Sequence, residues 1–282
     1  TLLINNTKSI YKNVEIIKTD ISNNEQIKLN LYDKNFDVIF HIASLPGDTG
    51  DPRQMMDVNV NGLLNLLEYS KNSNVKRFIL SSSISALEWY PATKFNKPDY
   101  LPIDENHPCR PKDMYSSTKR MQELLALSFY HQYKVPVTIL RLTAVVGPKG
   151  RGGGRGYFEM AKMLKKRKTV TIPHFNEEEL CHYVDIRDVG RLHLIASEHK
   201  KAIGEIFNCC GSRPTTGKEF GDIIKKYIPE INVKCGFPWS MAQGGEISFS
   251  MKKAKDMIGF VPKYSMDESI KSIIKWIDSP DY

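Results

Sequence analysis

Short apolar runs alternate along the chain with longer stretches whose apolar residues recur every three or four positions. The runs are typical of buried strands, and the longer stretches are typical of helices packed on a sheet. The pattern predicts strands at Val14–Ile17, Val38–Ile42, Val75–Ser81, Val135–Leu142 and Ile206–Asn208. It predicts helices at Asn24–Lys34, Pro52–Lys71, Asp113–Tyr133, Tyr157–Lys168, Gly217–Tyr227, Met251–Ile258 and Met266–Ile277, and a strand followed by a helix at Val184–Ser197. We therefore expect an α/β fold with a doubly wound parallel sheet and a smaller mixed C-terminal lobe.

The composition fits a folded protein, since 41% of the residues are hydrophobic and 26% are charged. No run approaches the roughly 18 apolar residues that span a bilayer, and the first residues lack the features of a signal peptide. The sequence therefore predicts a cytoplasmic protein that does not act at a membrane. The five cysteines contain no C-x-x-C pair, so we expect reduced thiols rather than a disulfide framework or a metal site.

The net charge of +8 invites a nucleic-acid partner, but its distribution changes that interpretation. Residues 149–168 hold eight lysines and arginines against the single acid Glu159, so the rest of the chain is nearly neutral. This stretch includes the glycine-rich segment Gly147 to Gly156, which resembles RGG-type nucleic-acid segments. A phosphate-binding loop and a solvated basic surface are equally compatible with it, and nucleic acid is not the expected partner.

Candidate chemistry lies at the start of the helix predicted over Asp113–Tyr133. Tyr115 and Lys119 are four residues apart, so both lie on one helix face. A free tyrosine has a pKa of about 10, and a neighbouring ammonium group should lower it toward the range of a useful acid or base. Such a pair suits the interconversion of an alcohol and a ketone. Three serines, Ser81 to Ser83, end an upstream strand, and ligands of doubly wound sheets lie at such strand ends.

These features, taken with others in the same order, resemble the NAD-dependent epimerase/dehydratase family of extended short-chain dehydrogenases/reductases, of the UDP-glucose 4-epimerase-like kind. The resemblance extends from about residue 13 to the end of the chain. It is carried by Asp20-Ile21, Asp37 to Ser44, Asn59-Val60-Asn61-Gly62 with Asn65 to Glu68, Ser81 to Ser83, Ile103 to Pro108, Tyr115-x-x-x-Lys119, Leu140-Arg141, Val146-Gly147-Pro148, Tyr183 to Val189, and Phe260-Val261-Pro262 before a helix that reaches Trp276.

The resemblance implies a Rossmann-type dinucleotide fold and a role for each matching residue. Tyr115 would be the acid/base, Lys119 would tune it and hold the nicotinamide ribose, and Ser83 would bond the reacting oxygen. The implied cofactor is NAD, with NADP left open. The implied cofactor-binding residues are Asp20, Ile21, Ile42, Ala43, Ser44, Asn59, Ser81, Tyr115, Lys119 and Thr143, with Asn59 supporting the loop at residues 42–44. The candidate substrate-binding residues are Ser83, Ser85, Tyr115, Arg151, Arg155 and Tyr157.

One expected part of the family pattern is missing from these residues. The glycine-rich pyrophosphate loop follows the first strand in such folds, yet no glycine precedes Gly47. We expect that roughly 35–45 residues, about one βαβ half-unit, precede Thr1 in the complete protein. The alternative is a degenerate protein that has lost its cofactor loop. The residue that chooses between NAD and NADP would lie in the missing part.

Departures at the substrate positions leave the function open. Sugar-nucleotide members commonly have Asn at the position of Ala144 and Arg at the position of Cys181. The leading hypothesis is an epimerase or dehydratase that acts on a nucleoside-diphosphate sugar. The first alternative is a simple ketone/alcohol oxidoreductase, similar to hydroxysteroid and flavonol-type reductases. The second is a non-catalytic nucleotide- or RNA-binding protein on the same scaffold.

The resemblance also implies two domains and a homodimer. The dinucleotide-binding domain would comprise residues 1–143 and 184–210, and the substrate lobe residues 144–183 and 211–282. Family members commonly pair through the two helices represented here by residues 52–71 and 113–133.

Overall fold

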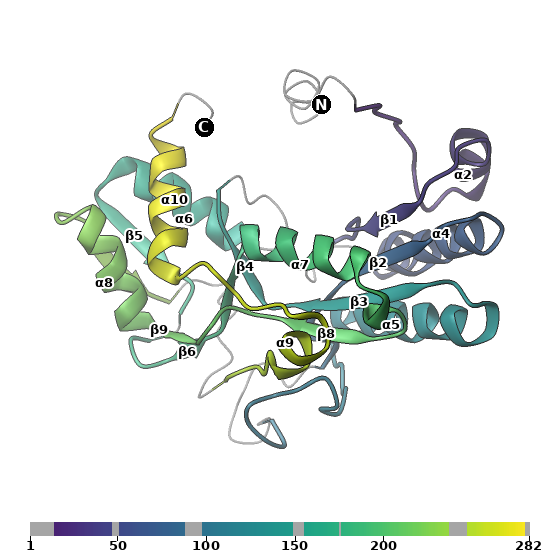
Figure 1. Ribbon diagram of the computed structural model, residues 1–282. Helices are drawn as coiled ribbons and strands as arrows, with labels where there is room; N and C mark the ends of the chain where they lie inside the picture. Colours follow the sequence, from purple (N-terminus) through teal and green to yellow (C-terminus); the bar gives the residue numbers. More distant parts are fainter. Residues whose placement is uncertain are drawn as a thin grey trace.

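A four-stranded parallel sheet lies at the centre of the computed structural model, which describes residues 14–46, 51–87, 98–148, 155–174, 176–236 and 247–279, with backbone alone for 155–158 (Figure 1). The strand order is β1-β2-β3-β8, and every neighbouring pair is parallel. The strands span Val38–His41 (β1), Arg77–Ser83 (β2), Val137–Leu142 (β3) and Ile206–Cys209 (β8). All four therefore present their carboxyl ends at the same edge of the sheet.

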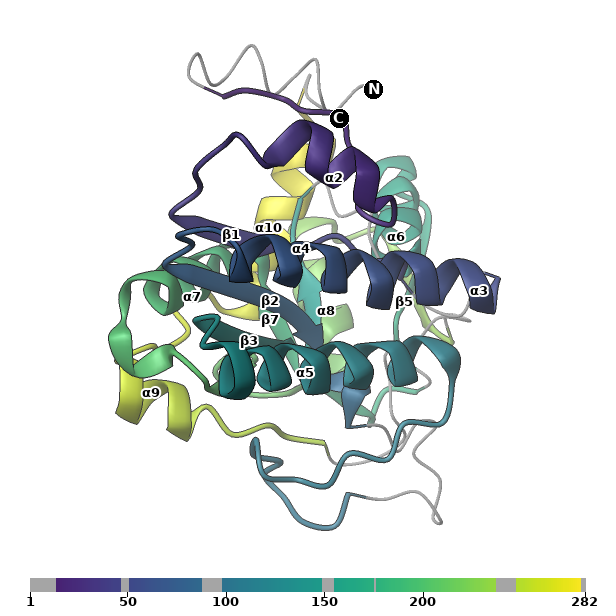
Figure 2. The same ribbon diagram turned by 90° about the vertical axis from the view of Figure 1, so that its right-hand side faces the viewer.

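Helices cover both faces of this sheet because successive strand residues point to opposite sides. Phe78 and Leu80 pack on one side with α2 (Asn24–Leu31), α4 (Gly62–Lys71) and α5 (Met114–Tyr133). Ile79 packs on the other side with α7 (Ile186–Glu198) and α9 (Lys252–Ile258). Figure 2 shows α4 and α5 side by side on the first face. The arrangement confirms the predicted α/β class with helices on both faces.

A second apolar cluster lies beyond the carboxyl edge of the sheet. It joins α6 (Arg155–Lys166), α8 (Gly217–Tyr227) and α10 (Met266–Ile277), which Figure 1 shows to one side of the sheet around β5. β5 (Thr169–Ile172) pairs in parallel with β10 (Asn232–Cys235). Two shorter pairs link the cluster to the sheet: β4 (Ala144–Val146) with β7 (Tyr183–Asp185), and β6 (Leu180–Cys181) with β9 (Thr215–Thr216).

The long helix predicted over Pro52–Lys71 forms in three consecutive parts. These are α3 (Pro52–Met55), the π-helical turn η1 (Met56–Asn61) and α4. Single π turns inside α-helices are frequent at functional sites, because they shift the direction in which a side chain points. Two short 3₁₀ turns complete the elements, η2 (Ile84–Ala86) and η3 (Lys200–Ala202).

Several sequence predictions differ from the structure. The strand predicted at Val14–Ile17 is wrong, because no described segment pairs with it and a strand requires a hydrogen-bonded neighbour. The short strands β4, β5, β6, β9 and β10 were not predicted, since two to four residues carry too little periodicity. The basic helix begins at Arg155 rather than Tyr157, and the glycine-rich residues 149–154 lie outside the described residues. None of the helices within the described ranges is long and apolar enough to cross a membrane.

Asp188 connects the sheet to the C-terminal helices. Its buried carboxylate pairs with Arg191 and accepts hydrogen bonds from the backbone N–H groups of Lys263 (2.9 Å) and Tyr264 (2.9 Å), just before α10. Because the substitution removes the acceptor of both N–H groups, Asp188→Ala should lower the free energy of unfolding by about 1–3 kcal/mol, as measured by urea denaturation. The control is Asp222→Ala, which breaks the exposed pair with Lys218 and should change stability by less than about 0.5 kcal/mol. Equal effects of the two substitutions would contradict this role of Asp188.

Candidate active site

The amino end of α5 brings two predicted site residues, Tyr115 and Lys119, to a third, Ser83, at the carboxyl end of β2. The Asp113 side chain caps the helix by accepting a hydrogen bond from the Ser116 backbone N–H at 2.8 Å. The helix then places Tyr115 so that its hydroxyl is hydrogen-bonded to the side chain of Ser83, the last residue of β2. Lys119 follows one helical turn later, with its ammonium group 5.8 Å from the centre of the Tyr115 ring. The tyrosine, the serine and the lysine thus form one cluster.

Burial decides the protonation of this cluster. Lys119 is 3% exposed and donates a hydrogen bond from Nζ to the Ser81 carbonyl oxygen at 3.0 Å. Burial lowers the pKa of Lys119 to about 8, although the nearby Glu123 carboxylate acts in the opposite direction. Burial raises the pKa of Tyr115 to about 12, with the Ser83 hydrogen bond opposing the shift. The expected lowering of the tyrosine pKa is therefore wrong for the residues that surround Tyr115 in this structure.

Asn59, which lies in the π-helical turn, holds the loop that follows β1. Its side-chain oxygen accepts hydrogen bonds from the Leu45 backbone N–H (2.7 Å) and the Ser44 hydroxyl (3.0 Å). Its amide nitrogen donates to the Thr118 hydroxyl of α5 at 3.0 Å. Gln122 of α5 donates to the Asn59 backbone carbonyl oxygen at 2.6 Å. A single buried amide thus sets the position of residues 44–45 relative to the helix that carries Tyr115.

The loop held by Asn59 has a surface that a dinucleotide could cover. Ile42 is 66% exposed and Ala43 is also exposed, directly after β1, which is an edge strand of the described sheet. The neighbouring His41 is buried, and its Nε2 has no hydrogen-bond partner in the structure. Burial and the Lys119 ammonium lower the pKa of His41 to about 4, so its ring is neutral. An exposed apolar loop beside an unpartnered buried nitrogen fits the ribose and nicotinamide side of the predicted cofactor.

Three more predicted cofactor residues, Ile21, Asp20 and Thr143, lie within the described part of the chain. Ile21 packs against Gly62, where a Cβ atom would lie 2.9 Å from the isoleucine side chain, and its carbonyl accepts a hydrogen bond from Asn65 at 2.8 Å. Asp20 is exposed, and its carboxylate accepts hydrogen bonds from the backbone and hydroxyl of Ser22. Thr143 is buried, and both its hydroxyl and its N–H donate to the Cys209 carbonyl oxygen.

Ser81, also in the cofactor set, has a second partner besides Lys119. Its hydroxyl is hydrogen-bonded to His193 Nε2 of α7 at 2.8 Å. His193 Nδ1 lies 2.8 Å from the Val189 carbonyl oxygen, which can only accept a hydrogen bond. The hydroxyl of Ser81 is therefore the donor to His193. Ser81 thus connects the helices on the two faces of the sheet.

Sequence reasoning missed the buried ion pair of Glu123 and Arg141. Both side chains are buried, and Arg141 of β3 donates two hydrogen bonds to the Glu123 carboxylate, from Nε at 2.8 Å and from a terminal nitrogen at 2.9 Å. Ser82 (2.8 Å) and Arg120 (2.9 Å) also donate to this carboxylate. The position of Glu123, four residues after Lys119, could have revealed it, because that spacing places both on one helix face.

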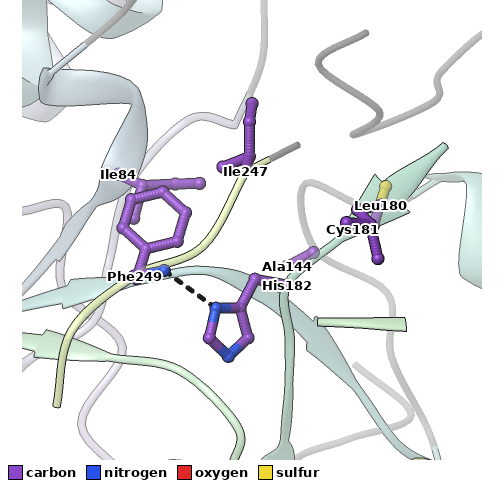
Figure 3. Close-up of a pocket in the computed structure, with 7 residues that line it drawn as sticks. All are labelled: Ile84, Ala144, Leu180, Cys181, His182, Ile247 and Phe249. Carbon is purple, nitrogen blue, oxygen red and sulfur yellow. Dashed lines mark hydrogen bonds between the residues drawn. The ribbon is translucent and has the colours of Figure 1, made fainter. Parts of the chain in front are cut away.

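A small pocket lies among residues of η2, β4 and β6, and its lining includes none of Ser83, Tyr115 and Lys119 (Figure 3). Its cavity volume is about 10 Å³, which is about the space of one water molecule. Ile84 follows Ser83 directly, and Ala144 lies two residues beyond Leu142, which is the cross-strand partner of Ser83. Ser85, the second candidate for the reacting oxygen, is hydrogen-bonded to Ser83 at 3.1 Å. The residues that line the pocket are Ile84, Ala144, Leu180, Cys181, His182, Ile247 and Phe249.

Three predicted substrate residues cannot be placed in the site. Arg151 and the side chains of Arg155 and Tyr157 lie outside the described residues. No group of three or more His, Cys, Asp or Glu side chains that could hold a metal ion occurs in the described part of the chain.

Comparison with known proteins gives one family. The model of the NAD dependent epimerase/dehydratase family matches residues 3–210. A UDP-glucuronate 4-epimerase of Thermodesulfobacterium geofontis is 26% identical over 271 residues, which cover 94% of this chain and 80% of that protein. A UDP-glucose 4-epimerase of Lactobacillus helveticus is 24% identical over 294 residues, which cover 95% of this chain and 85% of that protein. The crystal structure of a UDP-glucuronic acid 4-epimerase from Bacillus cereus with NAD has the same fold, with a TM-score of 0.82 at 22% identity over 98% of this chain and 85% of that one.

The Glu123–Arg141 pair gives the site its first testable prediction. Glu123→Gln leaves the buried Arg141 without its counter-charge, so the free energy of unfolding should fall by about 3–5 kcal/mol in urea denaturation. The double variant Glu123→Gln/Arg141→Met, which also removes the unpaired cation, should regain a large part of that loss. Arg120→Ala removes a partly exposed donor to the same carboxylate and should cost about 1 kcal/mol or less. A loss after Arg120→Ala as large as that after Glu123→Gln would refute the central place of the buried pair.

Proposed function

Because the chain belongs to the NAD-dependent epimerase/dehydratase family, we propose that it is an epimerase that inverts one hydroxyl-bearing carbon of a nucleoside-diphosphate sugar. It is an NAD-dependent enzyme with an α/β dinucleotide fold. Two relatives of known name act on UDP-glucose or UDP-glucuronate, as their names state, which supports a substrate of this class. The observation that carries the proposal is the hydrogen bond between Tyr115 and Ser83, with Lys119 one helical turn away.

When bound, NAD would supply a hydride acceptor and donor for the sugar carbon. The chain's own residues would transfer the proton and hold the sugar and the cofactor in place. As the phenolate, which the Lys119 ammonium group and a bound nicotinamide cation would favour, Tyr115 would take the proton of the reacting sugar hydroxyl and return it when the ketone is reduced, while Ser83 hydrogen-bonds the same oxygen. Lys119 holds the nicotinamide ribose through Nζ, and Asn59 keeps the loop of Ile42, Ala43 and Ser44 in place against it. A transient ketone that is reduced from its other side yields the epimer.

A simple ketone/alcohol oxidoreductase is the second candidate, and the apolar pocket favours it. Ala144 and Cys181 lack the polar groups that sugar-nucleotide members commonly place at these positions. The two candidates differ in their use of the cofactor, since an epimerase recycles NAD whereas a reductase consumes NAD(P)H in proportion to product. The non-catalytic alternative has less support, because an intact acid/base cluster is present.

We propose three further roles that do not follow from the contacts described above: diphosphate binding, a division into two domains, and a homodimer. Arg151, Arg155 and Tyr157 are proposed to contact the diphosphate. Residues 1–143 and 184–210 are proposed as the dinucleotide-binding domain, and the remainder as the substrate lobe. A homodimer through α4 and α5 is also proposed, because Met121 and Leu124 on α5 are 41% and 50% exposed, which is apolar surface that a partner would cover.

The function is tested by incubating the complete protein with UDP-glucose and a trace of NAD. We expect conversion to the C4 epimer, UDP-galactose, with many turnovers per NAD and no accumulation of free NADH. Tyr115→Phe removes one hydroxyl and should lower the rate at least about a hundredfold, because proton transfer by a placed group contributes about that much or more. Tyr130→Phe changes a tyrosine on the same helix outside the site and should leave the rate unchanged. Stoichiometric consumption of NAD(P)H with a ketone would support the second candidate instead.

Cofactor binding should depend on pH through Lys119. Its pKa is lowered to about 8, so the ammonium group is charged below about pH 8 and loses its charge as the pH rises through that value. NAD should therefore bind about tenfold more weakly at about pH 10 than at about pH 7, a loss of about 1.4 kcal/mol. Calorimetric titration measures this directly. In Lys119→Met the affinity should be lower and independent of pH, and a variant with the same pH dependence as the wild type would contradict the role of Lys119.

A further inference from the structure

His193 is a buried, titratable side chain that the proposed mechanism does not use. It is one of the residues of α7 that are turned into the protein, and it is only 6% exposed. Its ring contacts Phe40 of β1, with the two ring centres 6.1 Å apart. Burying an imidazole is costly unless its nitrogens are hydrogen-bonded, and both nitrogens of His193 are.

The two hydrogen bonds of His193 have a fixed direction. Nδ1 donates to the Val189 carbonyl oxygen at 2.8 Å, one helical turn earlier. Nε2 of the neutral ring can therefore only accept, and it accepts from the Ser81 hydroxyl at 2.8 Å. Burial lowers the pKa of His193, with the hydrogen bond to Val189 opposing the shift, so the ring is neutral at neutral pH. His193 thus acts on Ser81 as an acceptor.

Ser81 carries this contact across the sheet to Lys119. β2 pairs with β3 as far as Ser83 but with β1 only as far as Leu80, so in the described sheet Ser81 is the first residue of β2 held by a single neighbouring strand. Its carbonyl oxygen accepts a hydrogen bond from Lys119 Nζ at 3.0 Å. Since α5 and α7 cover opposite faces of the sheet, Ser81 joins a residue of each face to the other.

The charged form of Lys119 depends on this carbonyl oxygen, because the side chain is only 3% exposed and water does not solvate it. The Glu123 carboxylate of the same helix favours the ammonium form, and His41 of β1 is neutral. The ring of Tyr115 lies 5.8 Å from Nζ. A hydrogen bond to an ion contributes more than one between neutral groups, so displacement of the Ser81 carbonyl should destabilise the ammonium form.

We infer that His193 is a positioning residue for Lys119: by accepting the hydrogen bond of the Ser81 hydroxyl, it holds in place the carbonyl oxygen that receives the ammonium group. The inference rests on the proposed function, in which Lys119 binds the nicotinamide ribose. It gives α7 a part in cofactor binding from the face of the sheet opposite to α5.

The test follows the titration of Lys119 in the cofactor-free protein by NMR of lysine labelled with carbon-13 at Cε. The resonance is assigned by its loss in Lys119→Met, and its midpoint in the wild type should lie at about pH 8. His193→Leu removes the acceptor and should lower the midpoint by about one pH unit, since a hydrogen bond to a charged group contributes about that much. His193→Gln keeps an acceptor oxygen at a similar reach and should restore most of the shift. A wild-type midpoint in His193→Leu, or no recovery in His193→Gln, would overturn the inference.

Ser81→Ala breaks the same hydrogen bond from its other end, with a smaller change of side chain, and should lower the midpoint to a similar extent. Because the two substitutions remove one contact, the double variant His193→Leu/Ser81→Ala should shift the midpoint no further than either single variant. Fully additive shifts would contradict the inference. The control is His199→Leu, which changes the histidine at the carboxyl end of α7 and should leave the midpoint unchanged. A shift in this control as large as that in His193→Leu would also contradict it.

Calorimetric titration with NAD separates the inference from the proposed function. If Lys119 binds the ribose, the pH dependence of NAD affinity in His193→Leu should move to lower pH by the same shift of about one unit. An unmoved pH dependence in that variant would overturn the inference and leave the proposed function standing. Wild-type NAD affinity in Lys119→Met would instead refute the proposed role of Lys119, and the midpoints measured without NAD would still decide whether His193 positions the ammonium group.

Discussion

The buried carboxylate of Glu123 is the constraint on which the geometry of the site depends. A buried charge requires a counter-charge, because water does not solvate it. Arg141 of β3 supplies the counter-charge of Glu123, and Ser82 of β2 and Arg120 donate further hydrogen bonds to the carboxylate. These partners come from two strands, so α5 can meet the sheet in only one register. Lys119 lies one turn earlier on the same helix, and Tyr115 lies two turns earlier. The position of Tyr115 and Lys119, the proposed acid/base pair, is therefore fixed by a salt bridge one turn away from Lys119.

Because side chains alternate along β2, three adjacent serines have three different hydrogen-bond partners. Ser81 points toward α7 and donates to His193, while its carbonyl oxygen receives the Lys119 ammonium group. Ser82 points the other way and donates to Glu123. Ser83 ends the strand and meets the Tyr115 hydroxyl. A run of three small hydroxyl residues at a strand end thus joins helices on both faces, and the hydroxyl of Ser83 is the one proposed to meet the substrate.

The sequence was sufficient for the fold class and for the cluster of Ser83, Tyr115 and Lys119, because strand periodicity and helical spacing are local properties. It was insufficient for properties that depend on burial by residues far away in the sequence. The pKa of Tyr115 moves upward because the surroundings exclude water, which the neighbouring lysine in the sequence does not reveal. Glu123 and Arg141 lie 18 residues apart and meet only once α5 has packed on β3. The predicted strand at Val14–Ile17 had the right composition, but pairing is a property of two segments and not of one.

The central claim is that a hydride leaves the sugar and returns to the same carbon while Tyr115 exchanges the proton. The most direct measurement follows deuterium placed on the reacting carbon of UDP-glucose through repeated turnover in ordinary water. The account predicts that the deuterium stays on that carbon in both epimers, with none in the solvent and none in free cofactor. Loss of deuterium to water would instead indicate removal of a carbon-bound proton, and accumulation in reduced cofactor would indicate a net oxidoreductase; either result would contradict the account.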